Sequence, residues 1–190
     1  LGELDFLLRE GGSTRGIHLE LAVKFYLAHF DGQSWQFPGP DPRDNWQRKL
    51  DRLRTHQLRL TRDSPVREQL IERFPIEEIA VRQLIYGRLF LPMASEVVPL
   101  PEGMSASGLR GHWIYSSEWE RWFGIQKTVR IIPKALWPVV MTETIFDQLG
   151  AVSTGALLHQ AASRCVLCMI DPTEPPIFVV PDAWPQTSSE

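Results

Sequence analysis

The chain has 190 residues, of which 43% are hydrophobic and 23% are charged, and its formal net charge is -3 at pH 7. This length and composition are those of a globular protein and exclude wholesale disorder. The net charge provides no general attraction to nucleic acid or to an anionic membrane, so any such affinity must come from a local patch. Cys165 and Cys168 are the only cysteines, which excludes a disulfide scaffold.

No apolar run in the sequence approaches the length that spans a bilayer. Cysteine usage favours a reducing compartment. We therefore expect a cytoplasmic protein that does not associate with membranes.

Two alternating stretches near the N-terminus predict an antiparallel hairpin. Residues 3–8 and 17–26 alternate between apolar and polar side chains, and a glycine-rich loop over 9–16 joins them. The apolar members are expected to form one buried face: Leu4, Phe6, Leu8, Leu19, Leu21 and Val23. Because opposed residues of a strand pair share a face, the other face would carry Glu3, Asp5, Glu20 and Lys24.

Helices are predicted to follow the hairpin. Asp41 and Pro42 mark the start of a helix over residues 43–62, and a second helix is expected from Ser64 to about Phe74. A third helix is predicted over residues 75–86, followed by a short strand that Pro92 ends. Residues 92–111 are rich in proline, glycine and serine and predict a loop or linker.

The second half of the chain predicts a mixed fold. A strand is expected within residues 125–133, a short helix within 140–150 and two buried strands within 163–181. Cys165 and Cys168 are interpreted as core thiols, because a structural zinc site needs four ligands. Four of the seven tryptophans lie between residues 113 and 137, either as core residues or as a surface for bases or a protein partner.

The charged face of the hairpin has two interpretations. Asp5 and Glu20, with Glu3 alongside, could bind Mg²⁺, which takes one or two carboxylates together with waters and substrate phosphates. Lys24 could position the attacking water or stabilise charge on a phosphate. Alternatively, these residues form the solvated face of an ordinary hairpin, where charged cross-strand pairs are common.

The helix predicted over residues 43–62 has a local surplus of five positive charges in an otherwise acidic chain. In one interpretation it contacts a nucleic-acid backbone through Arg48, Lys49, Arg52 and His56. In the other, these residues are the solvated face of an amphipathic helix whose apolar residues turn inward.

The hairpin also resembles known families. "GELDFLL" followed by "HLELAVKF" resembles the core motif of the PD-(D/E)XK nuclease superfamily, in which an aspartate on one strand precedes an acidic-x-lysine on the next. More closely, "LGELDFLL", "HLELAVKFYL", "KLDRLRTHQL" and "GRLF" are similar to a bacterial family, domain of unknown function 1853, which is grouped with those nucleases. The resemblance implies that Asp5 binds metal and that Lys24 is the motif lysine. Ala22 departs from the acidic residue of the motif, and Glu20 would supply that carboxylate from a shifted position.

The resemblance and the element order together predict an α+β protein. Residues 1–91 are expected to form a restriction endonuclease-like core with a central mixed sheet flanked by helices, and residues 112–190 a tryptophan-rich extension. The superfamily core begins with a helix and a strand before the aspartate strand. The resemblance therefore implies a core truncated at its N-terminus.

The expected function is Mg²⁺-dependent phosphodiester hydrolysis of nucleic acid, with DNA as the first candidate. Asp5, Glu20 and Lys24 would be catalytic, and Glu3 would join the two carboxylates as a metal ligand. The alternative is a catalytically inactive nuclease-fold protein that binds nucleic acid or, through its tryptophan-rich half, a protein partner.

Overall fold

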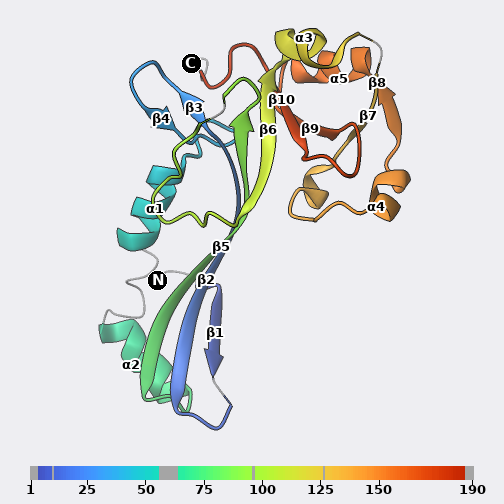
Figure 1. Cartoon of the computed structure of the whole chain (residues 1–190). Coiled ribbons are helices and arrows are strands. Elements are labelled where there is room, and N and C mark those ends of the chain that lie inside the picture. The colour runs from blue at the N-terminus through green and yellow to red at the C-terminus, as the bar shows by residue number, and fades with distance from the viewer. Residues whose placement is uncertain (1–3, 10, 56–63, 96, 126, 187–190) are drawn as a thin grey trace. The chain divides into compact units, whose positions relative to one another are not determined.

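The computed structural model describes residues 4–9, 11–55, 64–95, 97–125 and 127–186. The chain forms two compact units, the first from residues 1–24 and 47–86, the second from residues 25–46 and 87–190. Eight strands hydrogen-bond in the order β1-β2-β5-β6-β10-β9-β7-β8, and helices flank this mixed sheet (Figure 1). The predicted α+β fold with a central mixed sheet is confirmed.

The first unit contains the N-terminal hairpin. Strand β1 (Phe6–Arg9) pairs antiparallel with β2 (Arg15–Leu27), from Phe6 opposite Leu19 to Arg9 opposite Gly16. Helices α1 (Trp46–Thr55) and α2 (Ser64–Arg73) follow in the chain, and the unit also includes the first residues of β5 (Glu78–Pro92). Both β2 and β5 continue into the second unit. The predicted antiparallel hairpin is confirmed.

The second unit contains the larger part of the sheet. Strand β6 (Leu109–Tyr115) lies parallel to both β5 and β10 (Ile177–Val180). The ladder then continues antiparallel through β9 (Val166–Met169), β7 (Thr128–Ile131) and β8 (Ala151–Ser153). A separate small ladder joins β3 (His29–Phe30) to β4 (Trp35–Gln36).

Short helices cover both faces of this part of the sheet (Figure 1). Helix α5 (Thr154–Ala161) packs on one face with α3 (Trp119–Phe123), and Leu157 and Trp119 belong to one apolar cluster. Phe146 of α4 (Glu143–Gln148) belongs to a second cluster with Trp113 of β6. Two 3₁₀ helices complete the unit, η2 (Ser116–Glu118) and η3 (Lys134–Leu136).

Strands β9 and β10 are buried at every residue because both sheet faces are covered. Their side chains alternate between the two clusters. The cluster with Trp113 contains Leu167, Met169, Phe178 and Val180, and the cluster with Trp119 contains Val166, Cys168, Ile177 and Val179. The two buried strands predicted within residues 163–181 are confirmed. The strand predicted within 125–133 and the helix predicted within 140–150 are also present, as β7 and α4.

The helix predicted over residues 75–86 is wrong. Residues 78–86 belong to β5, a strand of 15 residues that runs from Glu78 to Pro92. Pro75 suggested the start of a helix, but Ile79, Val81 and Ile85 are β-branched and fit a pleated surface. Pairing of β5 with its neighbours in the sheet decides the outcome, because a helix here would leave backbone groups of the adjacent strand without partners.

The predicted start of the first long helix is also wrong. The backbone of residues 41–44 forms a turn, in which the N–H of Asp44 donates to the carbonyl of Asp41 at 3.0 Å, and α1 begins at Trp46. The Asp41 side chain caps this turn, because its Oδ1 accepts from the N–H of Arg43 at 3.1 Å. The end predicted at residue 62 lies outside the described residues.

Residues 92–111, predicted as a loop or linker, lie within the second unit. Across the residues that the structure describes, no helix combines the length and the apolar character needed to cross a bilayer.

Candidate functional site

Asp5 directly precedes the edge strand β1. The register pairs Phe6 with Leu19, so its extension by one residue places Asp5 beside Glu20. The side chain of Asp5 is exposed, and its Oδ2 accepts a hydrogen bond from the backbone N–H of Leu21 at 2.9 Å. This bond holds the Asp5 carboxylate against β2, the strand that carries the other predicted site residues.

Glu20 lies near the middle of β2 and is only 2% exposed. Its Oε1 lies 2.7 Å from Nε2 of His18, which is fully buried. Residues two apart on a strand project from the same face, so both side chains belong to the inner face of β2. A glutamate is almost never buried without a partner, and His18 provides that partner. His18 was not among the predicted site residues, although the His-x-Glu spacing on a predicted strand places the two side chains next to each other.

Ala22 and Lys24 continue the same face of β2 toward its C-terminal end, and both are half-buried. The alternation therefore brings Glu20 and Lys24 onto one face with Ala22 between them, as the sequence predicts. The methyl group of Ala22 stands where the nuclease motif has a carboxylate. On β2 itself, the inner face thus carries the imidazole of His18, the carboxylate of Glu20 and the ammonium group of Lys24.

The predicted burial of the two hairpin faces is wrong. On β2 the even-numbered residues Gly16, His18 and Glu20 are buried, whereas Leu21 and Val23 are 40% and 43% exposed. Phe6 and Leu8 of β1 are similarly exposed. Opposed residues do share a face as predicted, but the face with the buried carboxylate is the inner one. The hydrogen bond between His18 and Glu20 lowers the cost of burying two polar groups there.

The chemistry of Asp5 and Glu20 fits a hard divalent cation. Each is a carboxylate with one oxygen in a described hydrogen bond, Oδ2 of Asp5 and Oε1 of Glu20. Mg²⁺ needs only one or two carboxylates, with waters and phosphate oxygens as the other ligands. Glu3, the third predicted ligand, lies outside the described residues. Within the described part of the chain, no three His, Cys, Asp or Glu side chains gather as a metal-binding group.

The basic residues predicted to contact nucleic acid lie on α1. Arg48 and Arg52 are exposed and one helical turn apart, so they lie on the same side of the helix. Lys49 is half-buried, and Leu50 is 4% exposed and faces inward. His56 lies outside the described residues. Three of the four predicted contacts are thus placed on one short amphipathic helix.

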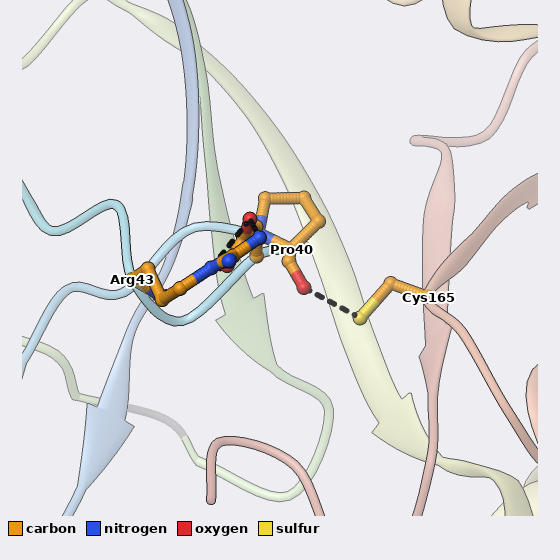
Figure 2. A network of polar contacts seen from close by, with 4 residues as sticks. Pro40, Arg43 and Cys165 are labelled. Atoms are coloured by element: carbon orange, nitrogen blue, oxygen red, sulfur yellow. Dashed lines mark hydrogen bonds and ion pairs between the residues drawn. The ribbon is translucent and has the colours of Figure 1, made fainter. Parts of the chain in front are cut away.

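The two cysteines are structural. Cys168 is fully buried in β9, and burial raises the pKa of its thiol to about 12. Cys165 is half-buried, and its Sγ donates to the carbonyl oxygen of Pro40 at 3.3 Å (Figure 2). Burial first, and then the charge of Asp41, raise the pKa of Cys165 to about 12. Both groups are neutral thiols near pH 7, in agreement with the interpretation as core residues.

The tryptophans of the second half are mainly core residues. Trp113, Trp119 and Trp184 are at most 5% exposed, and Nε1 of Trp113 donates to the carbonyl of Ala28 at 2.8 Å. Trp122 is the most exposed of the four between residues 113 and 137, at 37%.

Residues 1–171 match the family model described as domain of unknown function, DUF1853. The chain belongs to the DUF1853 family. No curated protein and no solved structure matches it. The DUF1853 match includes the hairpin and α1, so all the predicted site residues lie inside it, whereas β10 lies beyond it. The closer of the two sequence resemblances is thereby confirmed, and the relation to PD-(D/E)XK nucleases stays a prediction.

Proposed function

We propose that this DUF1853 protein is a Mg²⁺-dependent phosphodiesterase that acts on nucleic acid, with DNA as the first candidate substrate. The observation that carries the proposal is the burial of Glu20 on the inner face of β2. Extension of the hairpin register places Asp5 opposite Glu20, and Lys24 lies on the same face of β2 as Glu20. A hairpin stabilised only by burial would place Leu21 and Val23 inside. Burying a carboxylate instead is costly, and such arrangements are typical of functional sites.

Each residue has a distinct role in this proposal. Asp5 and Glu20 would hold the cation, with Glu3 as an accessory ligand. Bound Mg²⁺ would polarise a phosphoryl oxygen and lower the pKa of a coordinated water. His18, 2.7 Å from Glu20, would orient that carboxylate as a positioning residue. The ammonium group of Lys24 would orient the attacking water or stabilise negative charge on the phosphate.

Cleavage of fluorescently labelled single-stranded and double-stranded DNA by the full chain, with Mg²⁺ or Mn²⁺, tests the proposal. Asp5→Asn and Lys24→Met should each abolish cleavage, whereas Arg121→Met, which removes an exposed charge of the second unit, should preserve it. Both site variants alter residues outside the apolar core, and circular dichroism would verify their folding. Equal cleavage by wild type and Lys24→Met would refute the role of the lysine.

A second candidate is a non-catalytic binding module, and two observations favour it. Ala22 replaces the acidic residue of the motif, and one oxygen of Glu20 is already bonded to His18. The outer face of the hairpin, with Leu21 and Val23 exposed, would suit a protein partner, and α1 would suit a nucleic-acid backbone.

DNA affinity measured by fluorescence anisotropy across a salt series separates the two candidates. The binding module predicts salt-sensitive affinity that Arg52→Glu weakens, together with absent cleavage under every metal condition. The phosphodiesterase predicts cleavage that requires metal and depends on Asp5. Absence of both cleavage and salt-sensitive binding would refute both nucleic-acid functions.

A further inference from the structure

A cavity of about 330 Å³ lies in the second unit, where β7 ends and β9 begins. The two strands pair up to the bond from the N–H of Ile132 to the carbonyl of Leu167, at 2.8 Å. Pro133 follows, and because proline has no N–H the ladder stops there. After Pro133 the chain continues into η3, and on the neighbouring strand Arg164 and Cys165 directly precede β9. This divergence leaves a space between the two strand ends, within the size range of ligand pockets.

The inner walls of this cavity, which we call the β7–β9 cavity, are apolar. Ile131, Ile132, Val166 and Leu167 line it together with Trp137. The Trp137 ring is held in place, because its Nε1 donates to the carbonyl of Ile132 at 3.0 Å. Its ring also packs edge-on against Phe25 and Phe178, with centroid distances of 5.5 and 4.9 Å. A fixed aromatic wall favours an aromatic body in the ligand.

The lining of the cavity also includes two cations. Lys134 and Arg164 both line the cavity and are exposed. Arg164 donates to the amide oxygen of Gln160, a neutral partner, at 2.5 Å. Among the residues that the structure describes, no salt bridge joins either cation to a carboxylate. Two cations above apolar walls form a site for a negatively charged group.

The neighbouring loop leaves this positive charge largely uncompensated. Asp41 is close enough to Lys134 for the ammonium charge to contribute to its lowered pKa, but the main cause is hydrogen bonding from Arg43. Arg43 occupies both carboxylate oxygens of Asp41, with its Nε at 3.0 Å from Oδ1 and its second amine at 2.8 Å from Oδ2. The loop is tied beside the cavity by the bond from Cys165 to Pro40 (Figure 2).

We propose that the β7–β9 cavity binds a small organic anion with an aromatic body. The aromatic part would pack against Trp137 and the aliphatic side chains, and the anionic group, a phosphate or a carboxylate, would meet Lys134 and Arg164. The site consists of residues of the second unit alone and does not depend on the proposed phosphodiesterase activity of the hairpin.

Heteronuclear NMR of the ¹⁵N-labelled full chain tests this proposal through the indole N–H signal of Trp137, assigned with Trp137→Phe. AMP and indole-3-acetate are the probes, which carry the anion as a phosphate and as a carboxylate. Adenosine lacks the charge, and ribose 5-phosphate lacks the ring. We expect saturable shifts of the Trp137 signal with at least one of the two probes at millimolar concentration and weaker binding of both comparison compounds. A response to AMP alone assigns a phosphate ligand, and a response to indole-3-acetate alone assigns a carboxylate.

The double variant Lys134→Glu/Arg164→Glu should weaken probe binding by about tenfold or more, since two attractive charges become repulsive. The matched control, Arg121→Glu/Lys127→Glu, reverses two exposed charges elsewhere in the same unit and should leave the affinity unchanged. Equal affinity of the two double variants, adenosine binding as tight as that of AMP, or no response to either probe would each overturn the proposal.

Discussion

Replacing Glu20 by alanine tests the most unusual feature of the structure, a carboxylate on the inner face of a strand. Glu20 is 2% exposed, and its partner His18 is fully buried 2.7 Å away. Truncation would remove the hydrogen bond between this carboxylate and the histidine nitrogen, and the loss of one member of a buried hydrogen-bonded pair costs about 1–3 kcal/mol. The loss is expected near the upper end, about 2–3 kcal/mol, because hydrogen bonds to charged groups are stronger than neutral ones.

A double-mutant cycle isolates the pair. His18→Ala should also lower the free energy of unfolding. The double variant His18→Ala/Glu20→Ala should lose about 1–2 kcal/mol less than the sum of the two single variants, because both members of the hydrogen bond are removed together. Leu21→Ala is the control on the opposite face. Leu21 is 40% exposed, so its truncation should cost only about 1 kcal/mol, a fraction of the value for a fully buried leucine.

Urea unfolding followed by far-UV circular dichroism gives these free energies. Tryptophan fluorescence is a complementary signal rather than the primary one, because all seven tryptophans lie in the second unit, outside the hairpin. Additive effects of the two single variants would show that the bond contributes no coupling. A greater loss for Leu21→Ala than for Glu20→Ala would refute the assignment of the inner and outer faces.

Two further predictions concern the second unit. Gly111→Ala should lower the free energy of unfolding in urea by about 1–3 kcal/mol, since its new methyl group would lie 2.5 Å from the ring of Phe90. The control is Gly155→Ala, whose methyl group would have no such neighbour closer than 4.0 Å. This variant should be neutral or stabilising by less than about 1 kcal/mol. Asp182 accepts hydrogen bonds from Ser117, mainly from its backbone N–H, and these lower its pKa below 3.8. Its contribution to stability is therefore present above the unfolded-state pKa and is lost as the pH falls through the native one. The destabilisation by Asp182→Ala should be largest at pH 7 and should decrease as the pH falls through the native pKa of Asp182, and an equal loss across this pH range would contradict the assignment.

Local sequence patterns were sufficient to predict several of the strands. The alternation over residues 3–8 and 17–26 correctly predicts a hairpin and the parity of its register. The strand within 125–133 was also predictable from its alternation, and the two strands within 163–181 from apolar runs joined by a proline-rich turn. Family membership could likewise be inferred from the motifs near the N-terminus.

Only the end of β5 was predicted, as the short strand that Pro92 ends. Its first part follows Pro75, a residue typical of helix starts, and pairing within the sheet makes the extended form favourable there. The β7–β9 cavity also required the fold, because its two sides come from segments about thirty residues apart in the sequence.

By itself, the sequence determined that Asp5, Glu20 and Lys24 share one face of a hairpin, since side chains alternate strictly along strands. Only the tertiary structure decided that this face is the inner one. Alternation defines two faces without specifying which one is covered, and apolar side chains make the opposite assignment the natural expectation. The bond between His18 and Glu20 makes burial of the polar face possible, and it leaves Leu21 and Val23 exposed.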